Sequence, residues 1–265
     1  MRLQPAEAEE LADRYERDGV VVVRNAVPDR WLERLRESTD EALKQGKRYF
    51  AYRNLRNEPG GFQDFCLTSG IGRLVAEIGR STWTSLVFDT IFVKDPGSRT
   101  RTGWHTDQPY WPIAGPIVTT WIALDPVDAD NGAMEFVLGS HAWGKKYRPF
   151  LTDQKGDFVE YLCKDDPQYC DMPDFEAERD RHEMVHWELD PGDVLAFDGF
   201  MVHSAMGNRT ATRRRRGYAV RFALDRATYD PGQGVADWLV DDSIEPGAPY
   251  VSERFPCIYS AGIGS

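Results

Sequence analysis

From Ser85 onward the chain consists of short apolar runs that are separated by tight-turn signals. Runs rich in Val, Ile, Phe and Trp alternate with groups such as Asp95-Pro96-Gly97 and Asp190-Pro191-Gly192-Asp193. Because Gly and Pro weaken the interior of a strand and favour turns, each group marks a strand end. The pattern predicts strands over residues 86–94, 117–124, 133–137, 185–189, 193–197 and 217–224.

Helical patterns come before these strands. Residues 5–18 are rich in Ala, Glu and Leu with apolar residues on one face, and Gly19 follows them, which predicts a helix. The four valines of 20–23 indicate a short buried strand. Further helices are expected over residues 28–45, opened by Pro28, and over residues 71–80. Helices followed by many short strands favour a mostly β jelly roll with flanking helices.

One domain is expected, because the 265 residues contain no repeat and no low-complexity linker. Its parts are a mainly helical support over residues 1–84, a jelly-roll core over 85–225 and a C-terminal extension over 226–265. Residues 142–184 are polar and rich in Tyr, Asp and Lys. This composition predicts a long loop inserted in the core.

Composition excludes several classes of partner. The net charge of -11 argues against a general affinity for nucleic acid and against an electrostatic membrane anchor. No segment approaches the roughly 20 apolar residues that cross a bilayer, and residues 1–14 have no apolar core of a secretion signal. We therefore expect a soluble, cytoplasmic protein with reduced cysteines and a small-molecule substrate.

The histidines indicate a metal site. His105 and Asp107 are two residues apart, and in an extended segment such side chains point to the same side. His203 follows a later strand and turn, so another sheet edge can supply a third ligand. Two histidines and one carboxylate on one face leave positions open for a cosubstrate and O2, as in non-haem Fe(II) oxygenases. An isolated His-x-Asp is equally compatible with a surface pair.

Four consecutive arginines follow the distal histidine. The run Arg213-Arg214-Arg215-Arg216 begins ten residues after His203 and leads into the strand expected over 217–224. A guanidinium at a strand entrance can bind the far carboxylate of a dicarboxylic cosubstrate through two hydrogen bonds. One arginine suffices for this role, and a solvated basic turn accounts for the other three.

Several short segments occur in an order and spacing that are more specific than any one of them. They are Phe92-Val93-Lys94-Asp95-Pro96-Gly97, Trp104-His105-Thr106-Asp107-Gln108, Trp121-Ile122-Ala123-Leu124-Asp125, Asn131-Gly132-Ala133-Met134-Glu135-Phe136, Gly139-Ser140-His141, Pro191-Gly192-Asp193, and His203 with its downstream arginines. In this combination the chain resembles the phytanoyl-CoA dioxygenase family over roughly residues 85–225. The resemblance implies a double-stranded β-helix (a cupin-like jelly roll) with iron bound by His105, Asp107 and His203.

The resemblance also implies the reaction and its cofactors. Fe(II), 2-oxoglutarate and O2 would act together, giving succinate and CO2 while a small metabolite is hydroxylated or otherwise oxidised. The family's 2-oxoglutarate arginine follows the distal histidine by eleven residues, which favours Arg214, whereas alignment on Arg221-Phe222 at the end of the next strand gives Arg215. Further candidates to lie near 2-oxoglutarate are Trp121, Thr120 and Lys94.

Two positions modify this picture. The family often has a serine two residues after the distal histidine, where this chain has Ala205, so Ser204 or Thr120 is expected to substitute. Related halogenases carry Ala or Gly at the position of Asp107, so a carboxylate there favours hydroxylation or another oxidation. Three residues that follow the metal motif are candidates to line the substrate pocket: Gln108, Tyr110 and Trp111. Core packing is the alternative for Tyr110 and Trp111.

Two other functions are compatible with parts of the same sequence. His182-Glu183-Met184-Val185-His186 formally matches a zinc metallohydrolase motif, which requires a helix. Apolar and polar residues alternate from Val185 to Leu189, which predicts a strand, so we interpret the match as accidental. A cupin-like metal-binding protein without oxygen chemistry would share the fold, but it would not need the arginine after His203. We expect His141 to be structural.

Overall fold

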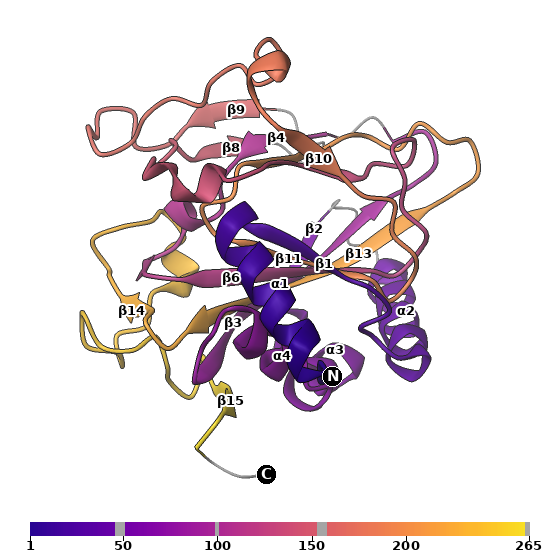
Figure 1. The fold of residues 1–265 in the computed structure, drawn as a ribbon, viewed down its shortest axis with the longest axis horizontal. Helices are drawn as coiled ribbons and strands as arrows, with labels where there is room; N and C mark the ends of the chain where they lie inside the picture. The colour runs from indigo at the N-terminus through magenta and orange to yellow at the C-terminus, as the bar shows by residue number, and fades with distance from the viewer. Residues whose placement is uncertain (46–50, 99–100, 153–157, 263–265) are drawn as a thin grey trace.

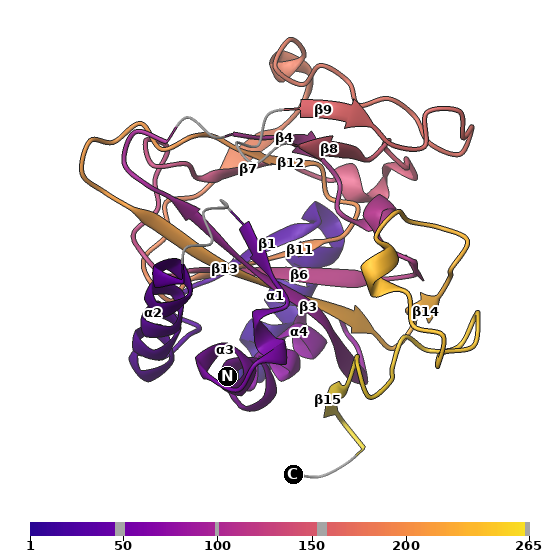
Figure 2. The ribbon, with the colours of Figure 1, turned by 180° about the vertical axis from the view of Figure 1, so that it is seen from behind.

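The chain folds into two facing antiparallel β-sheets, with helices packed on the outer face of the larger sheet (Figures 1 and 2). This computed structural model describes residues 1–45, 51–98, 101–152 and 158–262. Within these ranges the larger sheet has the strand order β1-β11-β6-β13-β3-β15, and β2 also pairs with β3. Its strands are β1 (Val20–Val23), β2 (Ala51–Arg53), β3 (Trp83–Lys94), β6 (Ile117–Ala123), β11 (Val194–Asp198), β13 (Arg215–Leu224) and β15 (Cys257–Ser260).

The smaller sheet lies above the larger one in Figure 1 and has the order β10-β7-β12-β4. Two further strand pairs, β5 with β14 and β8 with β9, lie outside both sheets. The bounds are β4 (Thr102–His105), β7 (Met134–Val137), β10 (Met184–His186), β12 (His203–Ala205), β5 (Ile113–Ala114), β14 (Thr228–Tyr229), β8 (Phe150–Thr152) and β9 (Phe158–Tyr161).

The helices build the outer core against the larger sheet. They are α1 (Pro5–Asp18), α2 (Asp29–Lys44), α3 (Gly61–Thr68) and α4 (Ile71–Ile78). Helix α1 ends at Gly19, which has a φ of +80° and so adopts the left-handed conformation that glycine favours. Buried side chains such as Leu11, Leu35 and Leu74 pack against apolar residues of the sheet. This packing supplies the main stability of helices this short.

The position of strand β1 between two cores explains why its sequence is continuously apolar. Val21 and Val23 face the outer core with the helices, while Val20 and Val22 face the core between the two sheets. A strand covered on both faces needs apolar side chains at every position.

The C-terminal segment is part of the fold. Strand β15 pairs with β3, and Tyr250 and Phe255 are buried in a third core with Phe88 and Trp111. The region predicted as an inserted loop over 142–184 contains the hairpin of β8 and β9 and reaches β10. Its Phe175 is fully buried and packs in one cluster with Val137 and Val202, so part of this region is anchored on the smaller sheet.

The structure contains each of the helices and strands that the sequence predicted, with ends shifted by a few residues. It adds helix α3 and the short strands β2, β4, β5, β8, β9, β12, β14 and β15, which the pattern did not indicate. Strands β4 and β12 are short and carry polar ligands, so they lack an apolar alternation. None of the helices in the described ranges is both long and apolar enough to cross a membrane.

Candidate active site

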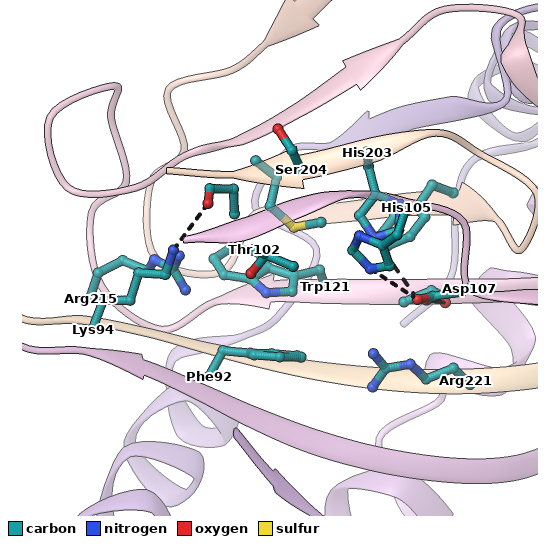
Figure 3. Close-up of a pocket in the computed structure, with 14 residues that line it drawn as sticks. Phe92, Lys94, Thr102, His105, Asp107, Trp121, His203, Ser204, Arg215 and Arg221 are labelled. Carbon is teal, nitrogen blue, oxygen red and sulfur yellow. Dashed lines mark hydrogen bonds and ion pairs between the residues drawn. The ribbon is translucent and has the colours of Figure 1, made fainter. Parts of the chain in front are cut away.

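The three expected metal ligands meet at the inner face of the smaller sheet. His105 ends β4 and His203 begins β12, and these residues lie opposite each other in the antiparallel pair. Asp107 follows two residues after β4 at the start of a short 3-10 helix. The Nε2 atoms of His105 and His203 lie 3.5 and 4.0 Å from Oδ1 of Asp107 (Figure 3). One ligand atom from each residue lies within 4.8 Å of the other two, as a shared metal ion requires.

Backbone carbonyls fix the tautomers of both histidines. Nδ1 of His105 lies 2.8 Å from the Gly103 carbonyl, and Nδ1 of His203 lies 2.9 Å from the Met201 carbonyl. A carbonyl only accepts hydrogen bonds, so each Nδ1 carries the proton and each Nε2 directs its lone pair into the pocket. This donor set, two neutral imidazole nitrogens and a carboxylate oxygen, fits iron(II).

The protonation states of Asp107 and His203 also favour binding of a metal cation. Burial and then the neighbouring His105 lower the pKa of His203 to about 3, so His203 is neutral at pH 7. Burial alone raises the pKa of Asp107, but the contact with His105 and nearby positive charge, including that of Arg221, outweigh it and hold the pKa well below its usual range. Asp107 and His203 are therefore in the forms that bind a metal ion, without a proton having to leave.

Thr119 orients the carboxylate, a role that the sequence analysis missed. Its hydroxyl donates to Oδ2 of Asp107 at 3.2 Å and leaves Oδ1 facing the histidines. Thr119 lies on β6 two residues before Trp121, and both side chains line the pocket. The alternation of strand side chains is the signal that would have found it.

The pocket lies between the sheets, with the metal ligands on one side and a cationic end formed by Lys94 and Arg215 (Figure 3). Apolar side chains form much of its wall, which keeps the interior of the pocket poor in water. The remaining lining residues are Phe92, Thr102, Thr119, Trp121, Met134, Phe197, Ser204, Ala205 and Arg221.

The structure places Arg215, and not Arg214, in the pocket. The Arg215 side chain is 1% exposed, its guanidinium lies 5.3 Å from the ring centre of Trp121, and its Nη2 donates to the Gly132 carbonyl at 2.7 Å. Its Nε has no partner among the described residues. Arg214 points to the surface, where its Nε donates to Asp95 at 2.6 Å. Of the two arginines that the sequence left open, Arg215 is therefore the one that lines the pocket.

Lys94 lies beside Arg215 at the cationic end. Its Nζ donates to the carbonyl of Met206 and, at 3.4 Å, to that of Ala205. Burial, followed by the charges of Arg215 and Arg101, lowers the pKa of Lys94 to about 6. Lys94 therefore has a neutral amine near pH 7 and gains a proton readily when an anion arrives.

Thr120 does not face the pocket, contrary to its expected place near 2-oxoglutarate. Its hydroxyl donates to the Val220 carbonyl at 3.2 Å. Because successive strand residues point to opposite faces, Thr120 cannot share a face with Trp121, which lines the pocket. Ser204 and Ala205 both line the pocket.

The three residues expected in the substrate pocket lie outside its lining. Nε2 of Gln108 donates to the carbonyls of Ile113 and Gly115, which makes the side chain a structural link. Trp111 is buried in the C-terminal core. The hydroxyl of Tyr110 holds the backbone of Phe150 on β8. The 3-10 turn after Asp107 directs these side chains away from the metal.

Arg221 is a second buried cation of the pocket that the sequence analysis used only as an alignment point. It is 6% exposed and lies on β13, six residues after Arg215. Its guanidinium lies 4.6 and 5.9 Å from the ring centres of Phe88 and Phe92. Since Arg is almost never fully buried without a partner, this side chain calls for an explanation.

The remaining histidines do not form a second centre. His186 lies on strand β10 and not on a helix, so the zinc-hydrolase spacing lacks the shared helical face that it needs. His182 packs against Trp143 and Phe175. Nε2 of His141 lies 3.1 Å from the Glu16 carbonyl, in agreement with a structural role.

A family model described as phytanoyl-CoA dioxygenase (PhyH) matches residues 15–217, which include all three metal ligands. The chain belongs to this family. It is therefore an iron(II)- and 2-oxoglutarate-dependent dioxygenase that uses O2, as the sequence predicted.

The sequence identity to individual relatives is low. The chain is 23% identical to the multifunctional dioxygenase prhA of Penicillium brasilianum, over 86% of this chain and 75% of that protein. It is 21% identical to a probable phytanoyl-CoA dioxygenase of Caenorhabditis elegans, over 76% and 70% of the two chains. Among solved structures, the epimerase SnoN in complex with Fe3+, alpha-ketoglutarate and nogalamycin RO superposes with a TM-score of 0.73 at 22% identity, over 96% of this chain and 100% of that one. This likeness confirms the predicted jelly-roll fold.

Proposed function

We propose that His105, Asp107 and His203 hold the iron and that Arg215 holds the far carboxylate of 2-oxoglutarate while a small-molecule metabolite is hydroxylated or otherwise oxidised. The observation that carries this proposal is the occurrence in one pocket of three converging ligand atoms and a buried guanidinium. Iron(II), 2-oxoglutarate and O2 supply the oxidising chemistry when they are bound. The protein contributes binding, orientation and exclusion of water.

Arg215 is suited to a carboxylate because its position is fixed before any ligand arrives. Trp121 lies against the guanidinium, and the Gly132 carbonyl accepts from Nη2, which leaves the partnerless Nε available. Lys94 lies beside it and adds a donor that becomes charged when an anion binds. A fixed donor loses little conformational entropy on binding, so its charged hydrogen bonds contribute fully to affinity.

A small substrate is supported by the narrow apolar lining of the pocket and by the relatives. SnoN was solved with nogalamycin RO, a small molecule, in addition to alpha-ketoglutarate. The carboxylate at Asp107 occupies a metal position and so favours hydroxylation or a related oxidation over halogenation. The cytoplasmic location and the single-domain organisation stay predictions of the sequence.

The experiment is an anaerobic titration of the metal-free protein with Fe(II) and then 2-oxoglutarate, followed by the visible charge-transfer absorption of the chelate. We expect the absorption in the wild-type protein and its loss in His105→Ala. Arg215→Met should weaken 2-oxoglutarate binding about 10- to 100-fold, because a buried charged hydrogen bond contributes about 1.5–3 kcal/mol. Arg214→Met is the matched control, since this neighbouring arginine lies at the surface.

Two results would contradict the proposal. Normal 2-oxoglutarate binding by Arg215→Met with a loss in Arg214→Met would move the cosubstrate to the other arginine. Absence of the absorption in the wild-type protein, with tight zinc binding in its place, would favour a metal-binding protein or hydrolase without oxygen chemistry.

A further inference from the structure

Arg221 lies at the other end of the pocket from the site proposed for 2-oxoglutarate. Arg215 and Arg221 are six residues apart on β13, or about 20 Å between Cα atoms at about 3.3 Å per residue. In Figure 3 Arg221 lies below Asp107, and Phe92 separates it from Lys94 and Arg215. The pocket therefore has two cationic ends, with the metal ligands beside one of them.

The guanidinium of Arg221 has few hydrogen bonds for a buried cation. Nη1 lies 3.4 Å from the carbonyl of Ala219, which is a long contact, and Nε has no partner among the described residues. No carboxylate of the described residues lies within 4.0 Å of it. Buried cations with unfilled donors are costly to a fold, and a bound ligand is one way to fill them.

Neither nearby carboxylate is available as a lasting partner. Asp89 accepts hydrogen bonds from the Tyr218 hydroxyl at 2.8 Å and from the backbone N–H of Arg56. Asp89 follows Phe88 on β3, so its side chain leaves the sheet on the face opposite to the ring that contacts Arg221. Asp107 is one of the three residues that would hold the iron, and its charge would then be shared with that ion.

The sum of charges also favours an anionic ligand when iron and 2-oxoglutarate are bound. Divalent iron and Asp107 together leave one positive charge, Arg215 and Arg221 add two, and the 2-oxoglutarate dianion removes two. The loaded pocket keeps one positive charge, and Lys94 adds another if it is protonated. An anionic substrate would neutralise this excess, whereas a neutral substrate would leave it buried.

We propose that Arg221 binds a carboxylate of the substrate and so positions the neighbouring carbon at the iron. This inference rests on the proposed function and adds the substrate class, an organic acid with an apolar body. The ring of Phe92, which lines the pocket and has its centre 5.9 Å from the guanidinium, offers an apolar surface for that body. The guanidinium of Arg53, 5.1 Å from the ring centre of Trp238, is a further positive charge near Arg221.

The test uses matched carboxylic acids and amides on protein loaded with Ni(II) and saturated with 2-oxoglutarate. The pairs are hexanoate with hexanamide, phenylacetate with phenylacetamide, and 2-naphthoate with 2-naphthamide, and binding is measured by calorimetry. In the wild-type protein we expect at least one acid to bind about tenfold more tightly than its amide. Arg221→Met should reduce that preference to less than about twofold, while Arg221→Lys keeps part of it and Arg214→Met keeps all of it.

The outcomes separate this inference from the proposed function. If 2-oxoglutarate does not bind to the Ni(II) protein, the proposed function fails at the first titration. If 2-oxoglutarate binds normally but no acid is preferred over its amide, only the role of Arg221 is overturned. A loss of 2-oxoglutarate binding in Arg221→Met, with normal binding in Arg215→Met, would overturn the proposed role of Arg221. It would mean that Arg221, and not Arg215, binds 2-oxoglutarate. Unchanged 2-oxoglutarate affinity in Arg221→Met also shows that the variant is folded.

Discussion

Lys94 and Arg215 share a buried end of the pocket, although two cations side by side repel each other. The cost is reduced by the backbone: Nζ of Lys94 donates to the Met206 carbonyl, and the Arg215 guanidinium is held by Gly132 and Trp121. Burial, and then the charge of Arg215, still lower the pKa of Lys94. A dicarboxylate that binds here relieves the repulsion, so the end is arranged for an anion before one arrives.

Lys94 should make the stability of the ligand-free protein depend on pH. Its pKa is about 6 in the folded chain and near its ordinary value of 10.5 when unfolded. Between these values the unfolded state binds more protons, so the free energy of unfolding should rise with pH, by up to about 1.4 kcal/mol per pH unit from this group. Lys94→Met removes the contribution. Urea unfolding at pH 6.5 and 9 should give a smaller rise in the variant, and equal rises would contradict the placement of Lys94.

At the scale of elements, β13 determines which side chains enter the pocket. Its alternation turns Arg215 and Arg221 inward and Arg216 outward, where Arg216 pairs with Asp125. Gly217 lies between the two inward arginines, and a Cβ there would overlap the indole ring of Trp121. The glycine thus makes room for the ring that supports Arg215.

Gly217→Ala should therefore impair both folding and cosubstrate binding. Displacement of Trp121 should cost about 1–3 kcal/mol of stability, as other overpacked cores do, and should weaken 2-oxoglutarate binding because Arg215 loses its support. Denaturant unfolding and 2-oxoglutarate titration measure the two effects. Gly103→Ala is the matched control, since a Cβ there meets Phe150 at an ordinary 3.6 Å. Loss of binding in the control as well would show that any added methyl group near the site is harmful.

The Tyr110 side chain links the hairpin of β8 and β9 to the segment that follows Asp107. The Tyr110 hydroxyl donates to the Phe150 carbonyl and accepts from the Phe150 N–H, both at 2.9 Å. The Phe150 ring lies 6.2 Å from that of His105. Tyr110→Phe should free the hairpin at a cost of about 1–2 kcal/mol. Hydrogen exchange should quicken in β8 and β9 but not in β6, and unchanged exchange in the hairpin would refute this role.

The sequence predicted the main helices and strands and brought out the three residues whose ligand atoms converge in the structure, but it did not predict which face individual side chains occupy. The spacing of His105 and Asp107 is informative because any extended segment brings them together. The choice between Arg214 and Arg215 depends on strand register, and a shift of one residue exchanges inside for outside. Adjacent residues such as Thr120 and Trp121 cannot share a strand face, so the alternation of side chains allows only one of the two to face the pocket. The 3-10 turn that diverts Tyr110 has no comparable pattern.

At the scale of the molecule, the site exists only when both sheets are packed together. The histidines come from the smaller sheet, whereas Lys94, Arg215 and Arg221 come from strands of the larger sheet. The helices and the C-terminal segment bury the opposite face and one end of that larger sheet. A ligand that touches both sheets therefore binds the folded state and has little affinity for the unfolded chain.

The metal ion and then the cosubstrate should accordingly each raise the stability of the folded protein. Ni(II), which can occupy an iron site without supporting oxidation, should raise the melting temperature alone. 2-Oxoglutarate at 100 times its dissociation constant should then add about 2.7 kcal/mol, or roughly 5–10 °C. Asp107→Ala should lose both increments, and Arg215→Met should lose only the second. Thermal unfolding of the four ligand states measures this order. An equal rise with 2-oxoglutarate in the absence of metal would mean that the cosubstrate binds away from the ion.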